Sequence, residues 1–287
     1  MARIVSAAAT SHTFGATAGV EEAVARILDG MGAIGAAVQA SRPDVLVLAS
    51  SDHLNNFTLD AQIPLAVGVA DEYAPLGDLG LSRAPCRGSR AFGQAFAAWC
   101  AERGFDLVPV ENVTPDHGVA FPHAWLDPER TAALVPLYIN TVMTPAPSCA
   151  RAYALGVALR EFVEHGWPAG QRVAVVGSGG LSHWICMPDS GRVNETWDRE
   201  VIEYLAAGEG QRLAQLTHAE ILRNGGNGGL EVATWAFVAG ASGSARGRPV
   251  YYEPMTTWWT GMGGVLIDVA ASGEQDTALY AEFYKET

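Results

Sequence analysis

The sequence alternates between short apolar segments rich in β-favouring residues and longer stretches with helical periodicity. The apolar segments span residues 3–10, 44–50, 64–70, 106–113, 133–143, 172–178 and 249–254. Several of them lack strict apolar–polar alternation, as expected for strands that are covered on both faces. This alternation over the whole chain predicts an α/β layered fold with a mostly parallel sheet.

Two of the intervening stretches have clear helical patterns. Apolar residues recur every three or four positions in 20–41, and Leu155, Leu159 and Phe162 form a stripe in 148–166. The chain has no internal repeat and no charged or Pro-rich linker, and the Gly-rich segments 224–229 and 243–248 read as loops. We therefore expect one domain, residues 1–287, with a more helical segment packed on it at 190–245.

Composition excludes several classes of partner. The 287 residues carry a formal net charge of −13, and no Lys/Arg-rich run is present, so nucleic acids and anionic membranes are poor partners. The first residues lack the apolar region of a signal peptide, and no uncharged run reaches the length of a membrane span. The four cysteines are far apart, which favours reduced thiols. These features predict a soluble, cytoplasmic protein.

Four of the seven histidines follow predicted strands. They are His12, His53, His117 and His183, after the segments 3–10, 44–50, 106–113 and 172–178. In open α/β sheets, ligand sites form at the carboxyl ends of the strands, where the following loops make a crevice. Each histidine alone is compatible with an ordinary core or surface position, but together they predict a site at one edge of the sheet.

The other three histidines have simpler interpretations. His165 is predicted to end a helix, where a cation suits the helix dipole, and His218 lies near a helix start. His123 is close in sequence to His117, so it either lines the same crevice or is a packing or surface residue, which is the more common case.

Glu231 is an isolated carboxylate in apolar surroundings. It is the only charged residue between Arg223 and Arg246, and it lies at the start of an apolar helix predicted within 228–241. An ionised carboxylate in such a setting is costly unless it is paired or binds a metal. The alternative is a solvated position in the first helical turn, where the dipole stabilises an anion.

Two imidazoles and one carboxylate form the facial triad of non-haem Fe(II) oxygenases, which leaves coordination positions open for substrate and dioxygen. His12, His53 and Glu231 would fit this set, although they are too far apart in sequence to form a local motif. No HExxH, Walker or GxSxG motif competes, and the GSGG segment at 177–180 lacks the Lys of a phosphate loop.

Five short segments resemble one family. They are ATSH (9–12), SDHLNNF (51–57), PDHG (115–118), GSGGLSH (177–183) and GLEVATW (229–235). In this order they resemble the class III extradiol ring-cleavage dioxygenases, and they span nearly the full chain. The resemblance implies a three-layer α/β/α fold with a largely parallel, mixed sheet, and a catechol-type substrate cleaved with O2 beside its diol.

The resemblance also implies a set of site residues. Fe(II), with Mn(II) as the alternative, would be bound by His12, His53 and Glu231. The catalytic residues would be His183 as acid/base, His117 as a second active-site histidine, and Asp116.

The sequence departs from the family in three respects. His123 stands where members carry an aliphatic residue, which indicates a different substrate pocket, and some members have Asn in place of Ser51. No portion corresponds to the small α subunit of some members, so the chain either works alone or needs such a partner; we expect a homo-oligomer.

The residues leave two other functions open. One is a divalent-metal hydrolase on a related scaffold, with His183 as base, and the other is a non-catalytic binding descendant. Substrate contacts are less defined: Trp184 and the segment 256–264 offer aromatic walls, and Arg83 and Arg87 are candidate partners for a carboxylate.

Overall fold

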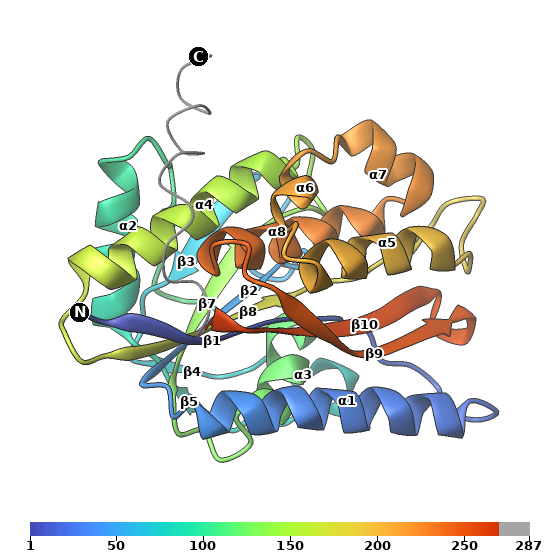
Figure 1. Ribbon diagram of the computed structural model, residues 1–287, viewed down its shortest axis with the longest axis horizontal. Helices are drawn as coiled ribbons and strands as arrows, with labels where there is room; N and C mark the ends of the chain where they lie inside the picture. Colours follow the sequence, from blue (N-terminus) through green and yellow to red (C-terminus); the bar gives the residue numbers. More distant parts are fainter. Residues whose placement is uncertain (270–287) are drawn as a thin grey trace.

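The computed structural model describes residues 1–269, and its centre is an eight-stranded sheet with the order β6-β3-β7-β2-β8-β1-β10-β9 (Figure 1). The strands are β1 (Arg3–Thr10), β2 (Val45–Ser50), β3 (Leu65–Gly68), β6 (Val108–Val110), β7 (Ala133–Ile139), β8 (Arg172–Ser178), β9 (Gly247–Met255) and β10 (Thr260–Ile267). A separate two-stranded ribbon joins β4 (Glu72–Tyr73) and β5 (Cys86–Arg87).

The sheet is mixed, with a parallel centre. Strands β7, β2, β8 and β1 run parallel to one another. At one side β10 is antiparallel to β1, and β9 to β10. At the other side β3 is antiparallel to β7 and parallel to β6, so β6 runs opposite to the central strands.

Helices cover both faces of the sheet (Figure 1). One face carries α1 (Glu21–Ala40) and α3 (His117–Leu126), and the other carries α2 (Arg90–Ala101), α4 (Cys149–Glu161), α5 (Glu195–Ala206) and α8 (Val232–Ala241). Shorter elements are η1 (Asp78–Gly80), η2 (Phe162–Gly166), α6 (Gln211–Ala214), α7 (His218–Asn224), η3 (Gly228–Glu231) and η4 (Thr256–Trp258). The three-layer α/β/α prediction is confirmed.

Strand β2 explains why the central segments lack polar alternation. Its residues Val45, Val47 and Ala49 pack in the core on the side of α4 and α8, whereas Leu46 and Leu48 pack on the side of α1 and α3. Because successive side chains point to opposite faces, a strand covered on both sides needs apolar residues throughout. Helix α8 is likewise buried at every position, which accounts for its lack of a polar face.

Most predicted elements lie where the sequence indicated. The helices predicted at 20–41 and 148–166 correspond to α1 and to α4 followed by η2, and the segment 190–245 is largely helical. The strand predicted at 106–113 is only three residues long, and part of the loop predicted at 243–248 belongs to β9. Domain extent stays a prediction, because residues 270–287 lie outside the described part of the chain.

Strand β10 was not predicted, since its sequence TGMGGVLI is rich in glycine, which is depleted in strands. A structural reason for one glycine is clear: a Cβ at Gly261 would lie 2.0 Å from Oδ2 of the buried Asp198. Among residues 1–269, no helix has both the length and the apolar character to cross a bilayer.

Candidate metal centre

Three of the four predicted site histidines follow adjacent parallel strands. His12 follows β1, His53 follows β2 and His183 follows β8, and these strands are neighbours in the order β2-β8-β1. Their side chains therefore gather at the carboxyl edge of the sheet, as predicted.

His117 reaches the same place by another route, so the reason given for it from the sequence is wrong. The strand before it, β6, runs opposite to β2, and its carboxyl end points away from this edge. The chain returns over residues 111–116, and His117 is the first residue of α3, after the N-cap Asp116.

The imidazoles of His12, His53 and His117 are in contact with one another. The ring centroids of His53 and His117 are 4.2 Å apart in a stacked arrangement, and the His12 ring stands edge-on to both, at 5.0 Å from His53 and 5.5 Å from His117. One ring nitrogen from each histidine lies within 4.8 Å of the other two. Such a cluster has the spacing of ligands around one metal ion.

Glu231 joins this cluster from the end of η3, immediately before α8. Its Oε1 lies 3.2 Å from Nε2 of His53, and its Oε2 lies 3.5 Å from Nε2 of His12 and 3.9 Å from Nε2 of His183. The backbone N–H of Gly180 donates to Oε2 at 2.7 Å. Glu231 is only 3% exposed, so it does not occupy a solvated first turn of a helix.

Every one of the four histidines has a hydrogen-bond partner at Nδ1. The partners of His12, His53, His117 and His183 are Ser178 Oγ (2.9 Å), Asp116 Oδ2 (3.1 Å), Asp78 Oδ2 (2.6 Å) and the Leu181 carbonyl (3.0 Å), respectively. Carboxylate and carbonyl oxygens only accept, and the Ser178 hydroxyl donates to the carbonyl of Gly118. We therefore assign the proton to Nδ1 in each neutral ring, which leaves the Nε2 lone pair for a metal or a substrate.

Asp116 acts on His53 and on its own helix. Its Oδ2 accepts from the backbone N–H and Nδ1 of His53, and its Oδ1 caps α3 by accepting from the N–H of Gly118 at 3.0 Å. Although burial opposes ionisation, the contact with His53 holds the pKa of Asp116 below its usual value. The predicted Asp116 thus lies at the site, where it orients a proposed ligand.

The segment SDHLNNF contains both a turn-forming carboxylate and a site histidine. Asp52 is fully buried, and its carboxylate accepts from the backbone N–H groups of Asn55, Asn56 and Phe57. The Nδ2 groups of Asn55 and Asn56 donate to the carbonyl of Thr114, close to Asp116. Asp52 therefore folds the loop that presents His53.

The electrostatics of the cluster favour a bound cation. Burial lowers the pKa of His12 to about 3, so this imidazole stays neutral with its lone pair available. The pKa of Glu231 is lowered, because the nearby His12, His53 and His183 outweigh its burial. For His53, burial is likewise outweighed, and contacts with Asp116 and Glu231 raise its pKa. A buried, ionised carboxylate among imidazole Nε2 atoms fits a divalent metal ion, which would replace the proton on His53.

The remaining histidines lie elsewhere. His165 is exposed and lies in η2. His218 is the first residue of α7, which agrees with its predicted position near a helix start. His123 is 5% exposed in α3 and lines a separate cavity of about 120 Å³ with Pro75, Leu81 and Arg130. Burial lowers the pKa of His123 to about 4.

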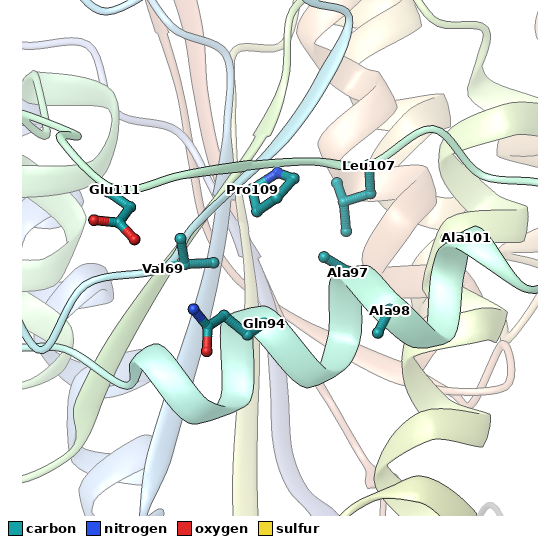
Figure 2. Close-up of a pocket in the computed structure, with 8 residues that line it drawn as sticks. All are labelled: Val69, Gln94, Ala97, Ala98, Ala101, Leu107, Pro109 and Glu111. Carbon is teal, nitrogen blue, oxygen red and sulfur yellow. The ribbon is translucent and has the colours of Figure 1, made fainter.

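A larger cavity, of about 440 Å³, is lined by residues of a different chemical character from those of the histidine cluster. Figure 2 shows it between α2 and the edge strand β6, with Ala97 on the helix facing Leu107 and Pro109. Its polar lining residues are Gln94 and Glu111, and it contains neither histidine nor cysteine. This lining offers no thiol, hydroxyl or imidazole group.

Sequence reasoning missed Asp78 and Ser178, which hold His117 and His12. Ser178 lies within the segment GSGGLSH but was not singled out there, and Asp78 lies outside the five segments, 39 residues before its partner. Of the aromatic candidates, Trp184 and Trp258 are buried and Trp259 is 52% exposed. Arg87 donates to the carbonyl of Thr131, whereas the side chain of Arg83 packs over Gly77, next to Asp78.

Comparison with known proteins decides the family. Residues 7–263 match the family described as the catalytic LigB subunit of aromatic ring-opening dioxygenase. The chain belongs to this family. It is therefore a dioxygenase, and the resemblance drawn from its five short segments is confirmed.

Relatives in the family carry more specific names. The 2,3-dihydroxyphenylpropionate/2,3-dihydroxicinnamic acid 1,2-dioxygenase of Photorhabdus laumondii is 27% identical over 77% of this chain and 83% of its own length. An enzyme of that name from Pseudomonas putida is 28% identical over 86% of this chain and 92% of its own length. The gallate dioxygenase of Pseudomonas putida is 33% identical over 59% of this chain and 49% of its own length.

A solved structure has the same fold. It is the crystal structure of an uncharacterised protein from Escherichia coli K12, with a TM-score of 0.61 and 16% identity, and the match covers 92% of this chain and all of the other. At this identity the match supports the fold alone.

Proposed function

We propose that this LigB-family chain is a non-haem Fe(II)-dependent extradiol dioxygenase, which opens the ring of a catechol-type substrate beside its diol with incorporation of O2. His12, His53 and Glu231 would hold the metal. The observation that carries this proposal is the buried carboxylate of Glu231, which meets Nε2 of His53 at 3.2 Å and Nε2 of His12 at 3.5 Å. Fe(II) held by these residues would leave positions for substrate and dioxygen and would lower the pKa of a coordinated hydroxyl.

A second ligand set is available at the same place. His12, His53 and His117 also have metal-ligand spacing, and three histidines are a familiar zinc set. The burial of Glu231 favours the set His12, His53 and Glu231. If the metal were bound by the three histidines instead, this ionised carboxylate, only 3% exposed, would be buried without a cation as its ligand partner. Mn(II) is the alternative metal for this oxygen- and nitrogen-containing set.

His183 is suited to take a proton from a substrate hydroxyl. Its Nδ1–H donates to the carbonyl of Leu181, and its free Nε2 lies 3.9 Å from Oε2 of Glu231. The ring lies between two glycines, since a Cβ at Gly180 would be 2.3 Å from its Cε1 and one at Gly228 would be 2.0 Å from its Nε2. A fixed imidazole beside the metal ligands can accept the hydroxyl proton and later return it during ring opening.

His117 would accept a hydrogen bond from a hydroxyl of the substrate. It is stacked on His53, and its Nδ1 is occupied by Asp78, so its Nε2 is the atom that can contact a ligand. Because it stands next to a proposed metal ligand, a bond from this ring orients the bound molecule relative to the metal.

The substrates we propose follow the names of the relatives. The names of these relatives give 2,3-dihydroxyphenylpropionate, 2,3-dihydroxycinnamic acid and gallate as their substrates. We propose a related catechol for this chain, which would work in the cytoplasm as a homo-oligomer, with a small α subunit as the alternative partner.

The deciding experiment combines metal loading with oxygen consumption. The metal-free chain is loaded anaerobically with Fe(II), Mn(II) or Zn(II), and O2 uptake is measured with 2,3-dihydroxyphenylpropionate, protocatechuate, gallate and an alkyl catechol. We expect uptake with Fe(II), a yellow ring-opened product, and both atoms of labelled O2 in that product. Turnover without O2, equal activity with zinc, or cleavage between the two hydroxyls would contradict the proposal.

A further inference from the structure

Asp78 is a carboxylate that contacts one active-site histidine twice. Its Oδ2 lies 2.6 Å from Nδ1 of His117 and accepts from the backbone N–H of His117 at 3.1 Å. We propose that Asp78 is a positioning residue, which fixes the Nδ1–H tautomer and the ring orientation of His117 so that its Nε2 lone pair faces the cluster. The kinetic consequence of this inference rests on the proposed function.

The loop that carries Asp78 is shaped to present this carboxylate. Gly77 and Gly80 have φ of +76° and +75°, and Leu79 between them has φ of +51°, a conformation that side chains other than glycine adopt at a cost. Leu79 is 54% exposed, so its own side chain gains little from this conformation. The N–H of Leu76 donates to the carbonyl of Pro115 at 2.8 Å, which ties the loop to the residues just before His117.

The same arrangement occurs a second time in this site. Oδ2 of Asp116 accepts from the backbone N–H of His53 at 2.9 Å and contacts its Nδ1 at 3.1 Å. The two rings held in this way are the stacked pair, His53 and His117. Two carboxylates thus fix two adjacent rings, each by its backbone and its Nδ1, which sets how both Nε2 atoms face.

The other oxygen of Asp78 distinguishes it from Asp116. Oδ1 of Asp78 is buried without a hydrogen-bond partner among residues 1–269, whereas Oδ1 of Asp116 caps α3. Within residues 1–269 the Asp78 side chain therefore makes its polar contacts with His117 alone, at the ring and at the backbone N–H that begins α3. If Asp78 acts through His117, removing His117 must remove the effect of Asp78.

A double-mutant cycle tests this coupling in the Fe(II)-loaded chain. Asp78→Asn keeps the size of the side chain and removes its charge, and we expect kcat to fall about tenfold to a hundredfold with little change in KM. In the His117→Ala background, the same substitution should change kcat less than about twofold, because residues that act as a unit are not additive. Asp60→Asn, which neutralises an exposed carboxylate, is the matched control and should leave kcat unchanged.

Two kinetic outcomes would overturn the inference. One is unchanged kcat in Asp78→Asn, and the other is an equal loss of kcat with and without His117. Thermal unfolding and iron content of each variant are measured in parallel, so that a loss of folded or loaded protein is not taken for a loss of positioning.

A second measurement is independent of turnover. Nuclear magnetic resonance of the metal-free full chain with isotope-labelled histidine reports which ring nitrogen is protonated, and His117→Gln assigns the His117 signal. We expect the Nδ1–H tautomer in the wild type and in Asp60→Asn, and its loss in Asp78→Ala. An Nε2–H tautomer in the wild type, or no change in Asp78→Ala, would refute the positioning role. A chain that shows this dependence but never consumes O2 would refute the proposed function and leave this inference standing.

Discussion

Two regions of the molecule bury histidines to a similar extent but use them differently. At the carboxyl edge of the sheet, His12 is 2% and His183 is 6% exposed; in the C-terminal half of α3, His123 is 5% exposed. Each edge histidine has a partner at Nδ1 and faces the shared acid Glu231 or a neighbouring ring, whereas Nε2 of His123 has no partner within residues 1–269. Burial alone therefore does not identify a functional histidine. The hydrogen-bond partners of the two ring nitrogens distinguish the edge histidines from His123.

The largest effect is expected at Glu231. Glu231→Gln should abolish iron binding and bring O2 uptake to background, because it removes the one anionic ligand of the proposed set. The matched control is His117→Ala, which should keep its iron. Metal analysis after desalting decides between the two sets: full iron in Glu231→Gln and none in His117→Ala would show that three histidines bind the metal.

The next effect separates ligands from acid–base residues. His183→Ala should retain a full complement of iron and lose about 10²- to 10⁴-fold in kcat, the usual contribution of a positioned acid–base group. Iron content and O2 uptake are measured on the same sample. Turnover at the wild-type rate would remove His183 from the mechanism, and loss of iron would make it a ligand.

Behind His183, the buried Asp198 should affect stability as a function of pH. It accepts from the N–H and hydroxyl of Ser182 and from the hydroxyl of Tyr252, and burial raises its pKa to about 6. Because the folded-state pKa is above the ordinary value of about 3.9, its stabilising contribution is full below pH 4 and is lost as the pH rises through 6. A pKa raised from about 3.9 to about 6 corresponds to about 3 kcal/mol of folding free energy.

Urea unfolding of the wild type and Asp198→Asn between pH 4.5 and about 7 checks this prediction. The free energy of unfolding of the wild type should fall relative to that of the variant as the pH rises. Parallel curves would show that Asp198 keeps an ordinary pKa in the folded chain.

The fold and the positions of His12, His53, His183 and Glu231 were predictable because their signals are local. Apolar segments mark the central strands, and His12, His53 and His183 come shortly after the ends of three of them, Thr10, Ser50 and Ser178. Glu231 was recognisable as the one charge before a helix that proved to be buried at every position. In each case the sequence around the residue contains the reason for its position.

The residues that were missed depend on contacts between distant segments. Asp78 reaches His117 from a loop 39 residues earlier, and Ser178 reaches His12 from a strand 166 residues later. Strand β10 was not predicted because it is rich in glycine, and its glycines leave space for neighbouring groups such as the Asp198 carboxylate. His117 was placed correctly for a wrong reason, since the reversed direction of β6 is set by pairing with β3.

Asp116 should have a smaller effect than His183. Asp116→Asn removes the charge that orients His53, and we expect iron affinity to fall about tenfold to a hundredfold, as for other residues that hold a metal ligand. Competition with a chelator of known affinity measures this change. Unchanged affinity would mean that the backbone contacts of the loop hold His53 without help from the carboxylate.

The smallest effect is expected at His123. Replacing this ring with leucine removes a buried polar atom that has no partner among the described residues, and it should raise the free energy of unfolding by about 1 kcal/mol. Iron content, kcat and the ranking of substrates should stay unchanged, because His123 lines its own cavity with Pro75, Leu81 and Arg130. The sequence comparison gave His123 a different meaning, as a departure from the family that marks an altered substrate pocket. A changed ranking of catechols in His123→Leu would support that interpretation, and it would show that the two regions contrasted above are coupled through α3.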